Sequence, residues 1–196
     1  MRIARCLIAA TAGVAGSTVL YAAPAVAAGP DATEASVGDS RLSGPGVGMS
    51  VTIPAGWHQI PDQSHPQLLQ MVYPETCSEP ATCASAIAGV FSRQAPSAQT
   101  AAEAVEQAIA GQPGMQGATV TDKGPIQVAG RAGYYVRFTY STANAKGQAE
   151  TVAVETGPAS SGMAPTSLIF VTVSDLAGAP PASVVDQIIG SAQLTA

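Results

Sequence analysis

The chain has 196 residues and a mass of 19.5 kDa, a length that favours one domain with room for a tail. Only 11% of the residues are charged and the formal net charge is −5, so the chain lacks the Lys/Arg surface that binding of nucleic-acid phosphates requires. Apolar residues make up 46% and the mean hydropathy is +0.23, which excludes a mainly disordered chain.

Residues 1–27 have the pattern of a cleaved export signal. A positive start and an apolar stretch of small residues lead to the Ala-Val-Ala that signal peptidase recognises (Arg2 and Arg5, 6–20 and 25–27), so cleavage is expected before Ala28. The alternative is an uncleaved anchor, but glycines and a proline leave the apolar run short of the roughly 20 residues of a membrane span. Lipidation would need a cysteine at the end of the apolar run, whereas Cys6 precedes it. We therefore expect a secreted or cell-envelope protein without a membrane anchor.

Removal of the signal changes the charge and the cysteine count. Six basic and 13 acidic residues remain, which gives a net charge of −7, and two cysteines are left in C-S-E-P-A-T-C. In an oxidising compartment the even pair Cys77 and Cys83 predicts a structural disulfide. A redox pair would favour Cys-x-x-Cys spacing, and no neighbouring Cys or His cluster completes a zinc set.

The first part of the exported chain predicts a leader followed by three strands. Residues 28–46 mix Gly, Pro, Ser and acidic residues without an apolar period, so they predict a flexible leader, with one domain at 47–196. Strands are expected at 49–53, 68–73 and 85–91, with Trp57 presented by the turn after the first. The third strand is rich in small residues, so another group is expected to pack closely against it.

Two segments have the pattern of helices. In the first, Thr100 and Glu103 have capping-box spacing, an apolar stripe follows (Ala101, Val105, Ala108 and Ile109), and Gly111 with Pro113 ends the helix. In the second, Pro180 and Pro181 precede a buried stripe that ends near Gly190 (Val184, Val185, Ile188 and Ile189).

Between these helices the pattern is that of strands, at 118–122, 126–129, 131–140, 149–155 and 167–173. The strand at 131–140 alternates, with aromatic and apolar residues on one face and Tyr135, Arg137 and Thr139 on the other (first face: Tyr134, Val136, Phe138 and Tyr140). The strand at 167–173 is apolar on both faces and is therefore expected at the centre of a sheet.

This order of elements, with TIPAGW at 52–57 and VAGRAGYYVRFTY at 128–140, resembles the PsbP-like fold. With the export signal and the Gly-Trp turn, the chain is most similar to the LpqN-type envelope proteins of actinobacteria, over about 47–194. The resemblance implies an α+β fold: an antiparallel sheet of about six strands flanked by two helices, in the order βββα-βββα. It implies no enzyme activity, because proteins of this fold mostly act as binding or assembly partners. The lipidation cysteine of the lipoprotein members is absent here.

Two motifs suggest catalysis or metal binding, and neither survives inspection. Residues 38–42 (GDSRL) resemble the nucleophile block of GDSL hydrolases, but Ser40 lies in the predicted leader and that family places its His near the C-terminus, unlike His58 and His65. His58, Asp62 and His65 could ligate a metal, but prolines make this segment a loop with no known ligand spacing, and a solvated loop is expected. We expect no catalytic, cofactor-binding or metal-binding residues and no cofactor.

Four aromatic residues are candidates for lining a ligand pocket: Trp57, Tyr134, Phe138 and Tyr140. A core role is the alternative for each, with Trp57 closing the end of the sheet. Small residues in the first helix leave room for a pocket beside the aromatic row.

The sequence favours a non-catalytic exported protein of the cell envelope that binds an apolar envelope molecule or a protein partner. One alternative is a secreted serine hydrolase that uses Ser40 with His58. Another is a secreted antigen or structural surface protein without a small ligand. None of these three functions involves nucleic acid, and the sequence does not predict an oligomeric state.

Overall fold

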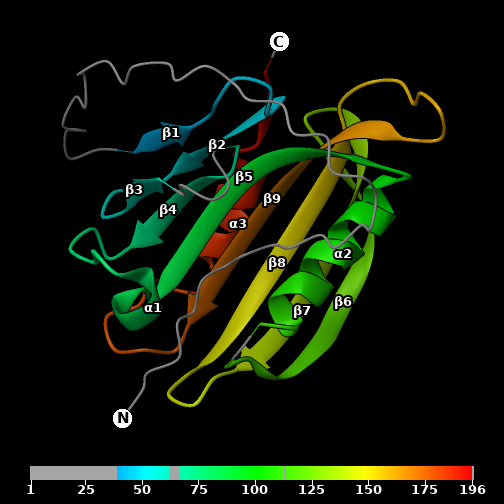
Figure 1. The fold of residues 1–196 in the computed structure, drawn as a ribbon. Coiled ribbons are helices and arrows are strands. Elements are labelled where there is room, and N and C mark those ends of the chain that lie inside the picture. The colour runs from blue at the N-terminus through cyan, green and yellow to red at the C-terminus, as the bar shows by residue number, and fades with distance from the viewer. Residues whose placement is uncertain (1–38, 62–66, 113, 196) are drawn as a thin grey trace, which may run out of the picture.

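The computed structural model describes residues 39–61, 67–112 and 114–195. The predicted export signal at 1–27 and the start of the predicted leader, 28–38, lie outside these residues. The fold is built on a seven-stranded antiparallel sheet with the order β3-β4-β5-β9-β8-β7-β6 (Figure 1). Its strands in chain order are β3 (His58–Pro61), β4 (Leu69–Tyr73), β5 (Ala86–Ala95), β6 (Gln116–Val128), β7 (Arg131–Ser141), β8 (Lys146–Glu155) and β9 (Ala164–Ser174).

A three-stranded sheet with the order β1-β2-β10 accompanies the main sheet. It consists of β1 (Ser40–Leu42), β2 (Met49–Ile53) and β10 (Gln193–Leu194), each pair antiparallel. Strand β1 falls inside the range 28–46 that the sequence assigned to a flexible leader, so paired structure begins earlier than expected. The reason is tertiary: Leu42 is buried in the core and β1 is held by β2, a partner that composition alone does not reveal.

The described residues also form three helices: α1 (Pro80–Cys83), α2 (Ala98–Ala110) and α3 (Val184–Gly190). Helix α2 lies on one face of the main sheet and α3 on the other (Figure 1). The predicted α+β class, with helices flanking an antiparallel sheet, is therefore correct. No helix in the described ranges is long and apolar enough to cross a membrane.

The predicted number and limits of the strands were partly wrong. The main sheet has seven strands instead of about six, because four of its strands, and not three, follow α2. Before α2 the segment after Trp57 contributes β3, while β2 belongs to the small sheet. The two short strands expected at 118–122 and 126–129 are one strand, β6. Pro125 is tolerated there because β6 is an edge strand: among the described residues it pairs with β7 alone, so no second strand needs the missing N–H.

The helix starts also differ from the prediction. Ser97, and not Thr100, is the N-cap of α2: its hydroxyl accepts a hydrogen bond from the Thr100 N–H at 3.1 Å. Glu103 instead accepts a hydrogen bond from Lys123 at 2.9 Å, across to β6. Helix α3 begins at Val184, after a turn that follows Pro181.

Two buried clusters hold the layers together, and each combines one helix with one face of the sheet. The α2-side cluster contains the apolar stripe of α2 and side chains of β7, β8 and β9, among them Phe138 and Phe170. The α3-side cluster contains α3, β2 and the other face of β5, β8 and β9, among them Met49 and Ile188. Strand β9 contributes to both clusters, as expected for a central strand that is apolar on both faces.

The predicted disulfide between Cys77 and Cys83 is present and closes the loop that contains α1, with the two Cα atoms 5.5 Å apart. Replacing both cysteines by alanine is expected to lower the free energy of unfolding by about 2.4 kcal/mol, because the short loop then gains entropy in the unfolded chain. Urea unfolding would measure this. The wild type under reducing conditions should match the variant; equal stability of the oxidised wild type and the variant would contradict the prediction.

Candidate functional site

The alternation of β7 divides its side chains between two environments. Its aromatic and apolar residues lie on the α2 side, while Tyr135, Arg137 and Thr139 lie on the α3 side. Helix α3 packs against β9, β8 and β2, and leaves the outer strands β6 and β7 largely uncovered on this face. Arg137 and Thr139 are accordingly exposed, and Tyr135 is half-buried.

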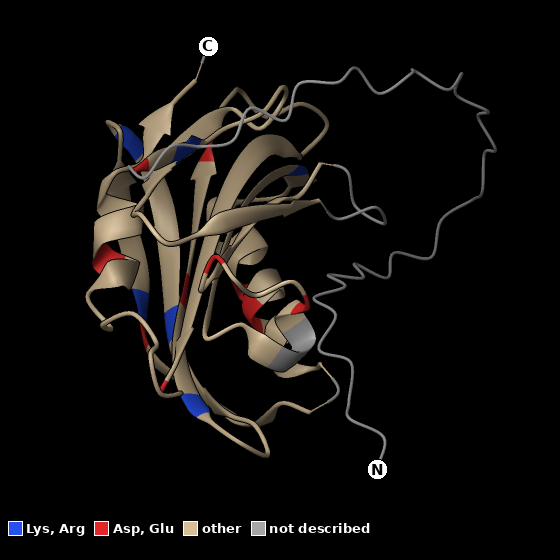
Figure 2. Ribbon diagram, turned by 90° about the vertical axis from the view of Figure 1, so that its left-hand side faces the viewer, with Lys and Arg blue, Asp and Glu red and all other residues tan. Residues whose placement is uncertain are grey.

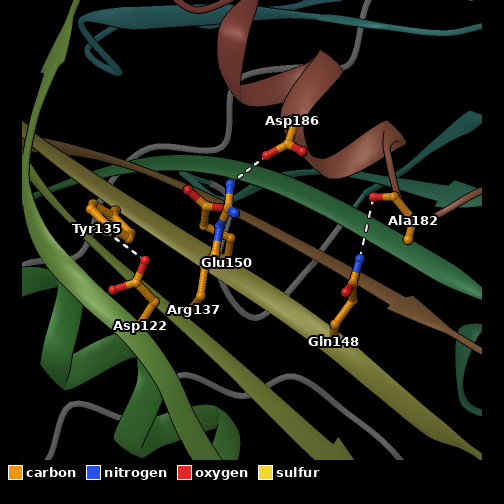
Figure 3. Close-up of polar contacts among 7 residues, drawn as sticks. All are labelled: Asp122, Tyr135, Arg137, Gln148, Glu150, Ala182 and Asp186. Atoms are coloured by element: carbon orange, nitrogen blue, oxygen red, sulfur yellow. Dashed lines mark hydrogen bonds and ion pairs between the residues drawn. The ribbon is translucent and has the colours of Figure 1, made fainter.

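A row of alternating charge crosses three strands on this open face. Asp122 of β6 lies opposite Arg137 of β7, and Arg137 lies opposite Glu150 of β8. Opposite charges in facing positions of antiparallel strands attract one another. The register therefore places Arg137 between two acidic residues along the row. In Figure 3 its guanidinium lies against Glu150 and Asp186, while Asp122 is turned toward Tyr135.

Arg137 makes two ion pairs, one within the sheet and one that joins the sheet to α3. Its Nε donates to Glu150 and its Nη2 donates to Asp186, which lies in the first turn of α3 (Figure 3). The Glu150 side chain is only 3% exposed, whereas the side chains of Arg137 and Asp186 are 45% and 65% exposed. The buried carboxylate is thus compensated by a cation that still reaches solvent.

The surroundings shift the pKa values of three of these groups. The hydrogen bond to Glu150 raises the pKa of Arg137. Burial raises the pKa of Glu150, although the hydrogen bond and the charge of Arg137 act in the opposite direction. The Tyr135 hydroxyl donates to Asp122 Oδ2 at 2.8 Å, and this hydrogen bond raises the pKa of Tyr135. Tyr135 lies across from Gly124 of β6, where the absence of a side chain leaves space beside its ring.

A groove of about 340 Å³ lies beside these ion pairs, between α3 and the strands β6, β7 and β8. The polar and charged residues of its lining include the three ion-paired residues (Thr121, Arg137, Thr139, Gln148, Glu150, Ser183 and Asp186). Gln148 lies opposite Thr139, and its amide donates to the Ala182 carbonyl at 3.3 Å, which joins β8 to the turn before α3. The groove therefore offers hydroxyl and carboxylate oxygens together with one guanidinium.

The four aromatic candidates do not meet in one pocket. Phe138 and Tyr140 are buried in the α2-side cluster and Tyr134 packs against it, whereas Trp57 is buried in the α3-side cluster, 5.7 Å from the Tyr73 ring centroid. Phe138 also borders the groove, where it contributes main chain because its side chain lies on the α2 side. Ligand contact by any of the four remains a prediction.

The hydrolase and metal candidates are placed as follows. Ser40 lies in β1 opposite Ile53, while His58 begins β3 in the main sheet, and no hydrogen bond joins them in the described part of the chain. Asp62 and His65 lie outside the described residues. Among those that are described, no three His, Cys, Asp or Glu residues gather as a metal site would require.

Sequence reasoning did not identify the ion-paired residues of the groove. The alternation of 131–140 did place Tyr135, Arg137 and Thr139 on one face, and that was the available signal. Nothing in the sequence indicated that Glu150 and Asp186, which are 13 and 49 residues further along, would meet Arg137.

Comparison with known proteins adds a similarity of fold. No protein-family model matches the chain, and no curated protein matches it. Among solved structures, it is similar to the cyanobacterial PsbP (CyanoP) of Synechocystis sp. PCC 6803, with 14% identity over 85% of this chain and 98% of that chain and a TM-score of 0.49. It is also similar to LpqN of Mycobacterium tuberculosis, which is involved in cell envelope biogenesis, with 14% identity over 76% and 83% and a TM-score of 0.46.

A protein of Bacteroides thetaiotaomicron VPI-5482 is similar with 10% identity and a TM-score of 0.48 over 82% of this chain. The present chain spans about half, 49%, of that longer protein. PsbP and LpqN are the two groups that the sequence resembles, and the similarity to both concerns the fold alone.

Proposed function

We propose that this chain is a non-catalytic exported protein of the cell envelope that binds a protein partner over the groove at Arg137. The pattern of an export signal at 1–27 supports the location. The disulfide between Cys77 and Cys83 supports it independently, because such bonds persist mainly in oxidising compartments.

The ion-paired state of Arg137 is the observation that carries the binding role. Glu150 and Asp186 both accept hydrogen bonds from the guanidinium, and Asp122 accepts one from Tyr135. A general acid or base needs a carboxyl group that is free to exchange a proton with a substrate. Carboxylates that are already engaged in this way are better suited to recognising a fixed partner than to transferring protons.

The placement of the apolar side chains favours a protein partner over an apolar envelope molecule. In the described residues the large apolar side chains pack mainly into the two clusters, and those that are exposed are the scattered Val120, Met163 and Leu176. Sites for apolar ligands are lined predominantly by apolar side chains. The lining of the groove is instead not predominantly apolar: it combines polar and apolar surface in similar amounts, as expected of a protein interface.

A crosslinking experiment in the native host tests this proposal. A photo-crosslinking amino acid is placed at Thr139, in the groove, and in a control at the exposed Gln107 of α2, on the opposite side of the sheet. We expect a protein adduct of discrete mass from Thr139 and none from Gln107. The purified protein is also extracted for lipid mass spectrometry.

Two results would overturn the proposal. Adducts of equal yield from both positions would show that the groove is not the contact surface. A stoichiometric lipid in the extract, with no protein adduct from Thr139, would assign the protein to carrying an apolar molecule.

A further inference from the structure

We infer that the partner presents a basic segment, with exposed lysine or arginine side chains, to the groove at Arg137. This inference rests on the proposed function and specifies the chemistry of the partner. It follows from the balance of charge at the groove, from the hydrogen-bonding groups that line it and from the overall charge of the exported chain.

The groove has an excess of negative charge. Two carboxylates, Glu150 and Asp186, line the groove together with the guanidinium of Arg137 that pairs with both. A third acidic residue, Asp122, lies beside the lining, opposite Arg137 in the strand register. The lining therefore carries a formal charge of −1, and the exposed Asp122 beside it adds one more negative charge. Figure 2 shows the basic residues of the described part at separate places on the ribbon. Arg131 and Lys146 lie at the starts of β7 and β8, away from the middle of the row.

The exposed carboxylates retain acceptors for a second cation. Asp186 uses Oδ1 for Arg137, and Asp122 uses Oδ2 for Tyr135, so each has one further oxygen that no contact in the described part occupies. The Asp186 side chain is 65% exposed. A lysine or arginine of the partner can pair with these oxygens without breaking the existing ion pairs.

Neutral groups of the groove suit a cation as well. The Gln148 amide nitrogen is engaged with Ala182, which leaves its carbonyl oxygen as an acceptor, and the hydroxyls of Thr121 and Thr139 can accept hydrogen bonds from an ammonium group. The half-buried Tyr135 ring beside Arg137 adds an aromatic face of the kind that attracts cations. An anionic segment would instead meet the exposed carboxylates of Asp122 and Asp186, and the guanidinium in the groove lining is already paired.

The net charge of the exported chain also favours a basic partner. Six basic and 13 acidic residues remain after cleavage at the predicted site, and this surplus attracts a basic partner before contact. Long-range attraction accelerates association, whereas the groove fixes where the basic side chains are bound.

Binding of synthetic peptides to the full exported chain tests this inference. The probes are fluorescent ten-residue peptides of alternating Lys and Ser, of alternating Glu and Ser, and of Gly and Ser, measured by fluorescence anisotropy. We expect the lysine peptide alone to bind, and to bind more weakly when the salt concentration is raised from about 50 to about 150 mM, because screening shortens the reach of the charges.

A matched pair of variants separates the groove from the net charge. Asp122→Asn with Asp186→Asn removes two charges at the groove; Glu103→Gln with Glu106→Gln removes two charges on α2, on the other side of the sheet. Asparagine keeps oxygen acceptors for Tyr135 and Arg137. We expect the first pair to weaken binding of the lysine peptide about tenfold and the second pair less than about twofold, with thermal unfolding confirming that both variants are folded.

Equal weakening by both pairs, or binding of the Gly-Ser peptide as tight as that of the lysine peptide, would overturn the inference. Absence of lysine-peptide binding together with a protein adduct at Thr139 would also overturn it while leaving the proposed function standing. Absence of both would overturn the two together.

Discussion

Replacing Gly89 by valine is expected to lower the free energy of unfolding by about 3 kcal/mol, the upper end of the cost of overpacking a core. Gly89 lies on the central strand β5 opposite Phe170 of β9. A Cβ atom at Gly89 would stand 2.2 Å from Cε1 of the Phe170 ring, far inside the 3.5–4.0 Å separation of carbon atoms in contact. Phe170 is 2% exposed and packs edge-on against Phe91, so its ring has little room to move.

Urea unfolding of three variants would test this explanation. Gly190→Ala, at the end of α3, is the control because an added Cβ there meets no atom within 4 Å, and it should leave the stability almost unchanged. Gly89→Val combined with Phe170→Leu should recover part of the loss, since the smaller side chain makes space. Full stability of Gly89→Val alone would refute the close packing of the ring on the strand.

Replacing Arg137 by methionine is expected to cost about 2 kcal/mol at pH 8 and roughly half of that at pH 5. Breaking a buried ion pair typically costs more, about 3–5 kcal/mol, but Arg137 is 45% exposed and solvent already screens the pair. Glu150 loses its cation while it stays buried, so its pKa rises further above the ordinary value of 4.5.

The direction of the pH dependence follows from linkage. A carboxyl whose pKa is raised in the folded state favours folding fully below its unfolded pKa, and this contribution is lost as the pH rises through the folded pKa. The variant should therefore lose more stability than the wild type as the pH increases above about 4.5. Chemical unfolding at pH 5 and pH 8 measures the difference.

Adding Glu150→Gln to Arg137→Met provides the control, because the glutamine carries no charge at either pH. The double variant should show a loss that no longer grows between pH 5 and pH 8. If the single variant were equally stable at both pH values, the buried carboxylate would not be the source of the cost.

Much of the fold could be predicted because the signals are local. The alternation at 49–53 and 131–140 gave strands whose limits agree with the structure within a residue, and the buried stripe of α3 was identified correctly. The small residues of the strand around Gly89 indicated a close neighbour, and the Phe170 ring is that neighbour.

The errors arose where distant segments override local chemistry. Lys123, Gly124 and Pro125 have the composition of a turn, yet they continue β6 because its pairing with β7 holds them. No strand of the described part pairs with the outer edge of β6, so a proline is tolerated there. Ser40–Leu42 has the composition of a leader, yet it pairs with β2. In both cases a partner strand forms the backbone hydrogen bonds, and the local sequence does not predict this pairing.

The sequence by itself determined which side chains share a face, that an export pattern precedes the domain, and that two cysteines are close enough to join. These properties depend on neighbours along the chain and on the two-residue period of a strand. Only the tertiary structure decided that Asp122, Arg137 and Glu150 form one row and that Asp186 reaches the same guanidinium. Strand register and the docking of α3 depend on how separate segments bury their apolar faces together, and that packing brings residues 49 positions apart into one groove.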